Sequence, residues 1–380
     1  MGEAILTRRP ESSPRGVLPA SRNSHEERAR SIEGTQGKTF EALIWMTREP
    51  NGSEAVSSIV ELREVQPIEI DGEDEIQSVV FLAVGHHILG GEKQNIRRWR
   101  VEEMNEVGTP MDAGSHVMSV AISQDGNLIV SGTWGGQVTV WDAENHQKAI
   151  EFRRHRGWVN AVDVSPDATK FATGSSDCTV RVWSFSSGEL LLGPLEHDYE
   201  VAAVKFSPDG SLIATATWDR QSLRIYDSKD SHLHHGFPVE VSSYRNQSLA
   251  WLSDSRQLFA LSCDGIIFCL DVFTGQILSQ WTFYHWDVRE LDDYPTCICL
   301  AGNDTFIAAS RNSSVSFWDI TRRKQIGPVI YHTATTICSM AISPNYDLVI
   351  GGGKKITLWH LPDILPRPYS DNVGAFASST

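Results

Sequence analysis

The feature that most constrains this chain is a repeat of about 42 residues. An aromatic or aliphatic residue closes a strand-like run seven times, and successive copies lie 42, 42, 43, 44, 48 and 41 residues apart. The seven positions are Trp99, Trp141, Trp183, Tyr226, Leu270, Trp318 and Trp359. A spacing this regular indicates repeated structural units that bury their apolar faces against one another.

Each copy contains short runs of β-branched and aromatic residues, separated by Gly, Asp, Asn and Ser turns every 8 to 12 residues or so. No window keeps the 3.6-residue period of an amphipathic helix, so the pattern predicts an all-β fold. The turn Ser-Pro-Asp-Gly at 207–210 illustrates the local chemistry, since Pro208 presets its φ angle and Gly210 closes the turn.

The best copies are 117–142, 155–184 and 197–227. They resemble the repeats of the WD-repeat (WD40) family, and the resemblance extends over about 65–361. It implies a seven-bladed β-propeller. The segment Val-Gln-Pro-Ile-Glu-Ile at 65–70 is expected to close the ring as the outer strand of the last blade, which would remove an open sheet edge. The apolar run at 40–46 is a rival for that role or an added outer strand.

The chain outside the repeats differs in composition. Residues 1–38 are polar and rich in Arg, Glu and Ser, which predicts a disordered extension. Residues 39–64 fit either a hairpin or extra strands on the propeller. The propeller follows at 65–361, and 362–380 is expected to be a tail because three prolines interrupt it.

The resemblance also implies a structural lock in each well-formed blade, in which a His, an Asp and the strand-closing aromatic form a buried hydrogen-bond chain. The two sets are His155, Asp177 and Trp183, and His197, Asp219 and Tyr226. A His–Asp pair could also be catalytic. Recurrence at the same repeat position favours packing, because an active site occurs once.

Charge and composition exclude several functions. With 33 Lys+Arg against 48 Asp+Glu, the net charge is −15, which argues against nucleic acid as the main ligand. The apolar runs are too short for a membrane-spanning helix. Without an export signal, the six cysteines are expected to be reduced. These features favour the cytoplasm, with the nucleus as the alternative, and no pattern predicts a metal or a cofactor.

Three patterns keep alternative functions open. Arg153 and Arg154 lie in a sequence similar to a phosphoinositide-binding motif, which would make a membrane platform. The stretch 214–229 resembles the motif by which some WD-repeat proteins become substrate receptors of a cullin-type ubiquitin ligase. An enzyme would need polar residues converging in the central channel, and the inner strands are mostly apolar.

The main hypothesis is a non-catalytic scaffold that binds protein or peptide partners on its loop face; the sequence does not indicate an oligomeric state. Loops have little core to fill, and Trp, Tyr and Arg are frequent binding hot spots. The candidate partner-binding residues are Trp134, Trp158, Trp218, Tyr199, Trp286, Arg156 and Arg311. The alternative is that each ring only caps the neighbouring blade.

Overall fold

The computed structural model describes two compact units, 1–65 and 66–380. In the first it describes the backbone of three strands, 28–33, 39–48 and 54–58. In the second it describes 67–369 apart from 83–85, 104, 219–222, 240, 242–246, 263, 284–296, 302–303, 335 and 368. Of the predicted site residues, Asp219 and Trp286 therefore lie outside the described part.

The first unit contains one antiparallel sheet of order β1-β2-β3. Its strands are β1 (Arg28–Glu33), β2 (Thr39–Arg48) and β3 (Glu54–Ser58). Strand β1 lies inside the stretch 1–38 for which the sequence predicts disorder, so the structure differs there. Strand β1 pairs with β2 through the backbone, which a polar side-chain pattern does not reveal.

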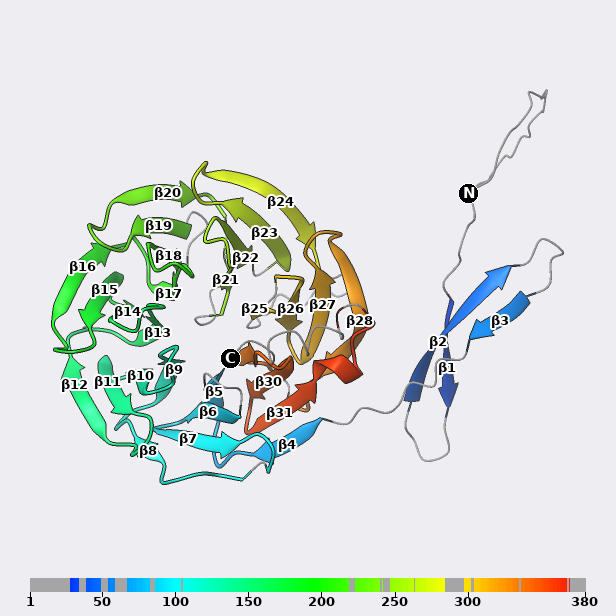
Figure 1. Cartoon of the computed structure of the whole chain (residues 1–380), viewed down its shortest axis with the longest axis horizontal. Coiled ribbons are helices and arrows are strands. Elements are labelled where there is room, and N and C mark those ends of the chain that lie inside the picture. Colours follow the sequence, from blue (N-terminus) through cyan, green and yellow to red (C-terminus); the bar gives the residue numbers. More distant parts are fainter. Residues whose placement is uncertain are drawn as a thin grey trace, which may run out of the picture. The chain divides into compact units, whose positions relative to one another are not determined.

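The described part of the second unit is a ring of seven four-stranded antiparallel sheets (Figure 1), and it confirms the all-β, seven-bladed fold. The blades are numbered in the order in which their innermost strands occur along the chain. Blade 1 contains β5 (Ile76–Phe81), β6 (His87–Glu92), β7 (Asn95–Arg100) and β8 (Met111–Asp112). Blade 2 contains β9 (Val117–Ile122), β10 (Leu128–Thr133), β11 (Gln137–Asp142) and β12 (Lys148–Arg153).

The next four blades repeat this order. Blade 3 contains β13 (Val159–Val164), β14 (Lys170–Ser175), β15 (Thr179–Ser184) and β16 (Leu190–Glu196). Blade 4 contains β17 (Val201–Phe206), β18 (Leu212–Thr217), β19 (Leu223–Asp227) and β20 (Leu233–Phe237). Blade 5 contains β21 (Leu249–Trp251), β22 (Gln257–Leu261), β23 (Ile266–Asp271) and β24 (Gln276–Thr282). Blade 6 contains β25 (Ile298–Leu300), β26 (Phe306–Arg311), β27 (Ser314–Asp319) and β28 (Lys324–Tyr331).

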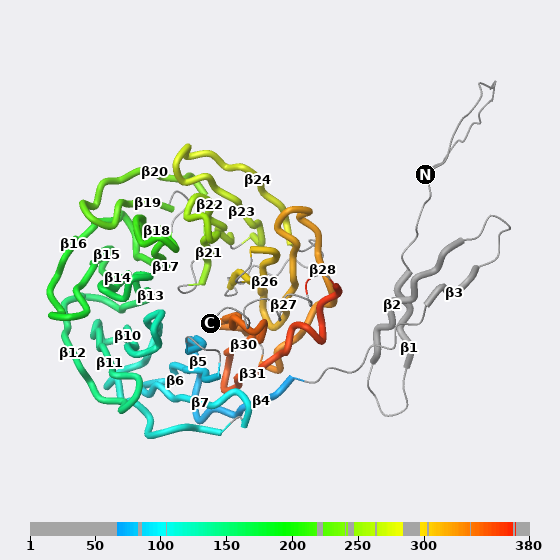
Figure 2. Tube along the Cα trace, viewed as in Figure 1, coloured from blue at the N-terminus to red at the C-terminus, as the bar shows by residue number. Residues whose placement is uncertain are grey.

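Blade 7 closes the ring with strands from both ends of the unit. It contains β29 (Ser339–Ile342), β30 (Asp347–Gly352), β31 (Lys355–His360) and β4 (Ile68–Asp71). Strand β4 lies beside β31 (Figure 2). The two strands pair antiparallel, and Ile70 is opposite Ile356. The closure predicted for 65–70 is therefore confirmed, and β31 has no open edge.

Burial explains the strand pattern. Strand β18 is buried along its whole length because neighbouring blades cover both of its faces, whereas most residues of the outer strand β16 are exposed. The core lies between blades: Val140 of blade 2 and Trp183 of blade 3 belong to one cluster of buried side chains. Each blade thus buries its apolar face against the next one.

The described part of the predicted tail packs onto blade 6. A short 3-10 helix (Leu361–Asp363) follows β31, and Leu365 and Tyr369 are buried beyond it. The Tyr369 hydroxyl donates to the Asp319 carboxylate and accepts from Arg322 Nη1 at 3.1 Å. The prolines of this segment end the strand pattern without preventing it from packing.

Candidate partner-binding face

One face of the ring collects the loops that carry the predicted aromatic residues. In an antiparallel blade, the turn between the second and third strands lies at the same end as the loop leading into the next inner strand. Trp134 lies in the turn between β10 and β11, and Trp158 lies in the loop between β12 and β13. Both side chains therefore lie on the same face.

Trp134 and Trp158 are in direct contact. Their ring centroids lie 4.9 Å apart at an interplanar angle of 86°, and His116 packs edge-on against Trp134 at 5.3 Å. Trp134 is 45% exposed and Trp158 is 40% exposed, although each indole is large and apolar. We call Trp134, Trp158 and His116 the aromatic cluster. The sequence did not indicate His116.

The backbone holds this cluster in place. The Trp134 amide donates to the His116 carbonyl at 2.8 Å, and the Trp158 amide donates to Ser176 Oγ at 2.7 Å. Gly136 has φ +76, and a Cβ there would lie 2.8 Å from the His155 carbonyl oxygen and 2.9 Å from that of Gly157. Only glycine allows the Trp134 turn to approach the blade 3 loop this closely.

Of the remaining predicted contact residues, Arg156 shares the loop of Trp158 and the others lie at other points of the ring. Trp218 (45% exposed) and Tyr199 (50% exposed) belong to blade 4, where the Trp218 amide donates to the Glu200 carbonyl at 3.2 Å. Arg156 is exposed and follows the lock histidine of blade 3, while the half-buried Arg311 ends β26 of blade 6. The structure thus brings Trp134 and Trp158 together and leaves Arg311 on a distant blade.

Blade 3 contains a continuous hydrogen-bond chain through its lock residues. His155 Nδ1 lies 2.9 Å from Asp177 Oδ2, and His155 Nε2 lies 2.7 Å from Thr173 Oγ1. The Trp183 indole donates to the same hydroxyl at 2.9 Å. Since Nδ1–H donates to the carboxylate, Nε2 accepts from Thr173, and every polar atom of this chain has a partner.

Asp177 is the anionic end of this chain. Burial alone would raise its pKa, but hydrogen bonds from His155, Thr179 and the Arg156 amide hold that pKa well below its usual range. The sequence analysis missed Thr173, although a signal exists. Ser131, Thr173 and Thr215 recur every 42 residues on the second strands of their blades. Ser131 accepts the Trp141 indole at 2.9 Å in the same way.

Blade 4 bonds its histidine differently. His197 Nδ1 lies 3.1 Å from the Leu195 carbonyl oxygen and Nε2 lies 2.9 Å from Thr215 Oγ1. Burial lowers the pKa of His197 to about 4. Tyr226 is buried and packs edge-on against the His197 ring, with 5.8 Å between ring centroids. The role of Asp219 stays a prediction.

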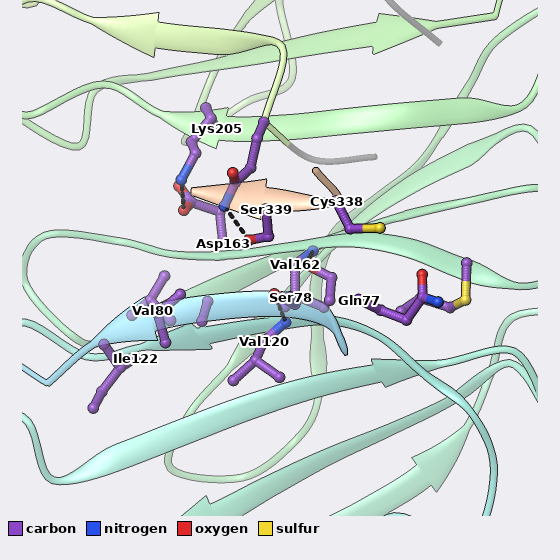
Figure 3. A pocket seen from close by; sticks show the side chains of 15 residues that line it. Gln77, Ser78, Val80, Val120, Ile122, Val162, Asp163, Lys205, Cys338 and Ser339 are labelled. Carbon is purple, nitrogen blue, oxygen red and sulfur yellow. Dashed lines mark hydrogen bonds and ion pairs between the residues drawn. The ribbon is translucent and has the colours of Figure 1, made fainter. Parts of the chain in front are cut away.

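The centre of the ring holds a cavity of about 200 Å³, which is lined by residues of inner strands (Figure 3). Its two charged side chains pair with each other, because Lys205 Nζ lies 2.9 Å from Asp163 Oδ1. Serines join neighbouring blades here: Ser339 Oγ accepts the Val79 amide at 2.8 Å and Ser78 Oγ accepts the Val120 amide at 3.1 Å. The Ser339 bond also helps to close the ring, because it joins blades 7 and 1.

Other polar clusters show no site geometry. His232 and His234 lie at the start of β20, with ring centroids 5.6 Å apart. In the described part of the chain, no three His, Cys, Asp or Glu side chains are grouped so that they could hold a metal ion. Burial raises the pKa of the Cys299 thiol, which makes it a poor nucleophile.

Comparison with known proteins agrees with this geometry. The family model described as "WD domain, G-beta repeat" matches 108–142, 147–184 and 190–227, and each stretch contains the outer strand of one blade followed by the first three strands of the next. Three consecutive matches coincide with the repeat spacing and with the seven-bladed ring.

The chain contains WD40 repeats, and the described part of its second unit is a seven-bladed β-propeller.

Two curated relatives resemble part of the propeller. Mitochondrial division protein 1 of Candida glabrata is 34% identical over 80 residues, and an uncharacterized WD repeat-containing protein of Schizosaccharomyces pombe is 33% identical over 76 residues. Each alignment covers 20% of this chain, and they cover only 10% and 16% of the relatives' own lengths. The similarity thus concerns the repeat and carries no partner with it.

No helix in the described part of the WD-repeat chain is both long enough and apolar enough to span a bilayer. Arg153 and Arg154, which resemble a phosphoinositide-binding motif, are both exposed at the end of β12. Part of the motif that resembles a ligase-docking sequence, 219–222, lies outside the described residues.

Proposed function

We propose that this propeller is a scaffold that binds protein or peptide partners on the face carrying the aromatic cluster. The observation that supports it is the contact between two exposed indoles, Trp134 and Trp158, on loops fixed by backbone hydrogen bonds. An apolar surface held rigidly in water lowers the entropic cost of binding. Trp residues in such positions are frequent hot spots.

The alternative role of these rings, capping the neighbouring blade, accounts for less. A capping indole would bury nearly all of its surface against the blade that it covers, whereas both indoles keep 40% or more of their surface exposed. Their mutual edge-on packing leaves the outer faces of the rings available to a partner.

We further propose that the protein is not an enzyme. The charged groups of the central cavity, Lys205 and Asp163, neutralise each other, and Asp163 Oδ2 also accepts the Phe206 amide at 2.8 Å. A cytoplasmic location, with the nucleus as the alternative, fits the free thiols of Cys178, Cys269, Cys299 and Cys338.

The test is co-purification from the source cells with a paired variant, Trp134→Ala with Trp158→Ala. A hot-spot Trp contributes about 2 kcal/mol or more, so the affinity for partners of this face should fall about 30-fold or more. These partners should then no longer co-purify. Phe273→Ala is the matched control, because Phe273 is 54% exposed in the turn after β23, at the opposite end of its blade. Retention of every partner by a normally folded Trp variant would disprove the proposal.

A further inference from the structure

Three arginines stand out beside the aromatic cluster. Arg153, Arg154 and Arg156 are all exposed. Within the described residues none of their side chains forms an ion pair, whereas Arg97 pairs with Glu92 at 2.7 Å and Arg256 pairs with Asp271 at 2.9 Å. In a chain with 48 acidic and 33 basic residues, these arginines form a local concentration of positive charge. We call these three residues the arginine group.

The repeat shows why these charges stay unpaired. In blade 4, Arg224 donates to the Glu196 carbonyl at 3.2 Å and pairs with Asp198 at 2.7 Å. The equivalent Arg181 of blade 3 makes the same bond, to the Arg154 carbonyl at 2.7 Å. Arg156 occupies the loop position that Asp198 has in blade 4, so blade 3 lacks the neutralising carboxylate.

The positive charge and the apolar surface are continuous. Arg156 precedes Trp158 by two residues in the same loop. The tight packing of Gly136 against the carbonyls of His155 and Gly157 brings the Trp134 turn onto that loop. An extended ligand only a few residues long could therefore contact both groups, since an extended chain rises roughly 3.3 Å per residue.

We infer that the partner segment bound at this face is an acidic peptide. Its carboxylates contact the arginine group, and one apolar side chain packs on Trp134 and Trp158. Arginine pairs with carboxylates in a fork geometry that gives both strength and orientation. This inference rests on the proposed function, because it names the chemistry of the partner at the same face.

Neighbouring charges favour a narrow peptide over an anionic membrane. On the face where the arginine group lies, the loop that leads into blade 4 carries Glu196, Asp198 and Glu200. The Asp198 side chain is 78% exposed. A flat bilayer would bring its negative charge against both loops, and the net charge of −15 would add to the repulsion. A peptide can place its acids on blade 3 alone.

The experiment uses the full chain and labelled synthetic peptides, with binding followed by fluorescence anisotropy. The acidic probe has one phenylalanine flanked by aspartates. A second probe replaces the aspartates with lysines, and a third replaces the phenylalanine with alanine. We expect the acidic probe to bind and the lysine probe not to bind. Added salt should lower the affinity for the acidic probe, because salt screens exposed ion pairs.

Two variants with the same change in net charge separate local from global electrostatics. The double variant Arg154→Glu with Arg156→Glu should lower the affinity for the acidic probe about tenfold or more. Two ion pairs with the probe are lost, and the new glutamates repel its aspartates. Lys229→Glu with Lys324→Glu is the control, since these lysines lie beside the turns between third and fourth strands, away from this face. The control should leave the affinity within about twofold.

The outcomes separate this inference from the proposed function. If the lysine probe binds better than the acidic probe and Trp158→Ala abolishes its binding, the face binds partners but the inferred charge is wrong. If the acidic probe binds through the arginines and Trp134→Ala with Trp158→Ala has no effect, the aromatic cluster is not the site. If the protein binds vesicles containing phosphoinositides through the arginine group and no acidic peptide, the inference is also overturned.

Discussion

Blades 3 and 4 are consecutive copies of one unit that agree in their interiors and differ at their surfaces. Their inner strand pairs have the same register irregularity, between Val159 and Ala161 in blade 3 and between Val201 and Ala203 in blade 4. Their loops carry opposite charges, with arginines at 154 and 156 where blade 4 has Glu196 and Asp198. Packing between blades constrains the strands, whereas solvent-facing loops can change charge without changing the fold.

The two blades also differ in the hydrogen-bond partners of their buried histidines. His155 contacts a carboxylate through Nδ1, while the equivalent atom of His197 contacts a backbone carbonyl. Both histidines keep a threonine hydroxyl at Nε2. The requirement is therefore that the buried ring be fully hydrogen-bonded, and the repeat tolerates more than one acceptor.

The largest expected effect comes from the buried indole of blade 3. Trp183→Ala should lower the free energy of unfolding by about 3–5 kcal/mol, because it empties a core position and leaves Thr173 without its donor. Trp158→Ala on the same blade is the control and should change it by no more than about 0.5 kcal/mol. Urea melts followed by circular dichroism measure both, and equal effects would contradict the assignment of Trp183 to the core.

Acid should destabilise the ring through blade 4 first. His197 binds a proton only near pH 4 when folded, but near its ordinary value of 6.5 when unfolded. Between these values the unfolded state binds more protons, so the free energy of unfolding falls as the pH drops from 6.5 to 4, by up to about 3 kcal/mol. Urea melts of the parent and His197→Gln across this range test it. The variant should show a flatter pH dependence, and identical curves would disprove the role of His197.

Removing the carboxylate of the blade 3 chain should have an intermediate effect. Asp177→Ala leaves His155 Nδ1 and two backbone amides without their acceptor, and we expect a loss of about 1–3 kcal/mol. The control is Asp198→Ala, whose side chain is exposed, with an expected loss of about 0.5 kcal/mol or less. A thermal or urea melt in which the two variants behave alike would refute the distinction between the blades.

The smallest effect should come from exchanging loop charges. Arg156→Asp gives Arg181 the partner that Arg224 has in blade 4, so we expect a gain of about 0.5 kcal/mol. Asp198→Arg should lower the free energy of unfolding by a similar amount, because Arg224 of blade 4 then loses its partner. A change of several kcal/mol from either substitution, measured by urea melts at low salt, would show that the loops contribute to the fold and not only to the surface.

The fold could be predicted from the sequence because the residues that form its core recur at a fixed spacing. Recurrence of Trp141, Trp183 and their equivalents reports a core that is rebuilt once per blade, and the closing strand at 65–70 follows from the need to pair a last edge. The packing of Leu365 and Tyr369 on blade 6 was not predicted, because the contact partners Phe306 and Asp319 lie far away in the sequence. The role of Thr173 has a periodic signal in the sequence, because Ser131 and Thr215 occupy the equivalent positions of blades 2 and 4.

The amino-acid sequence by itself determined the number of blades and the strand order within each blade, since both depend on residue types at a fixed spacing. The histidine–aspartate pair of blade 3 was implied by the resemblance to WD-repeat proteins. Only the tertiary structure decided which exposed residues meet. Trp134 and Trp158 belong to different blades, and their contact depends on the approach that Gly136 permits. The unpaired state of Arg156 depends equally on which side chains surround it in space, because ion pairs form by distance and not by sequence order.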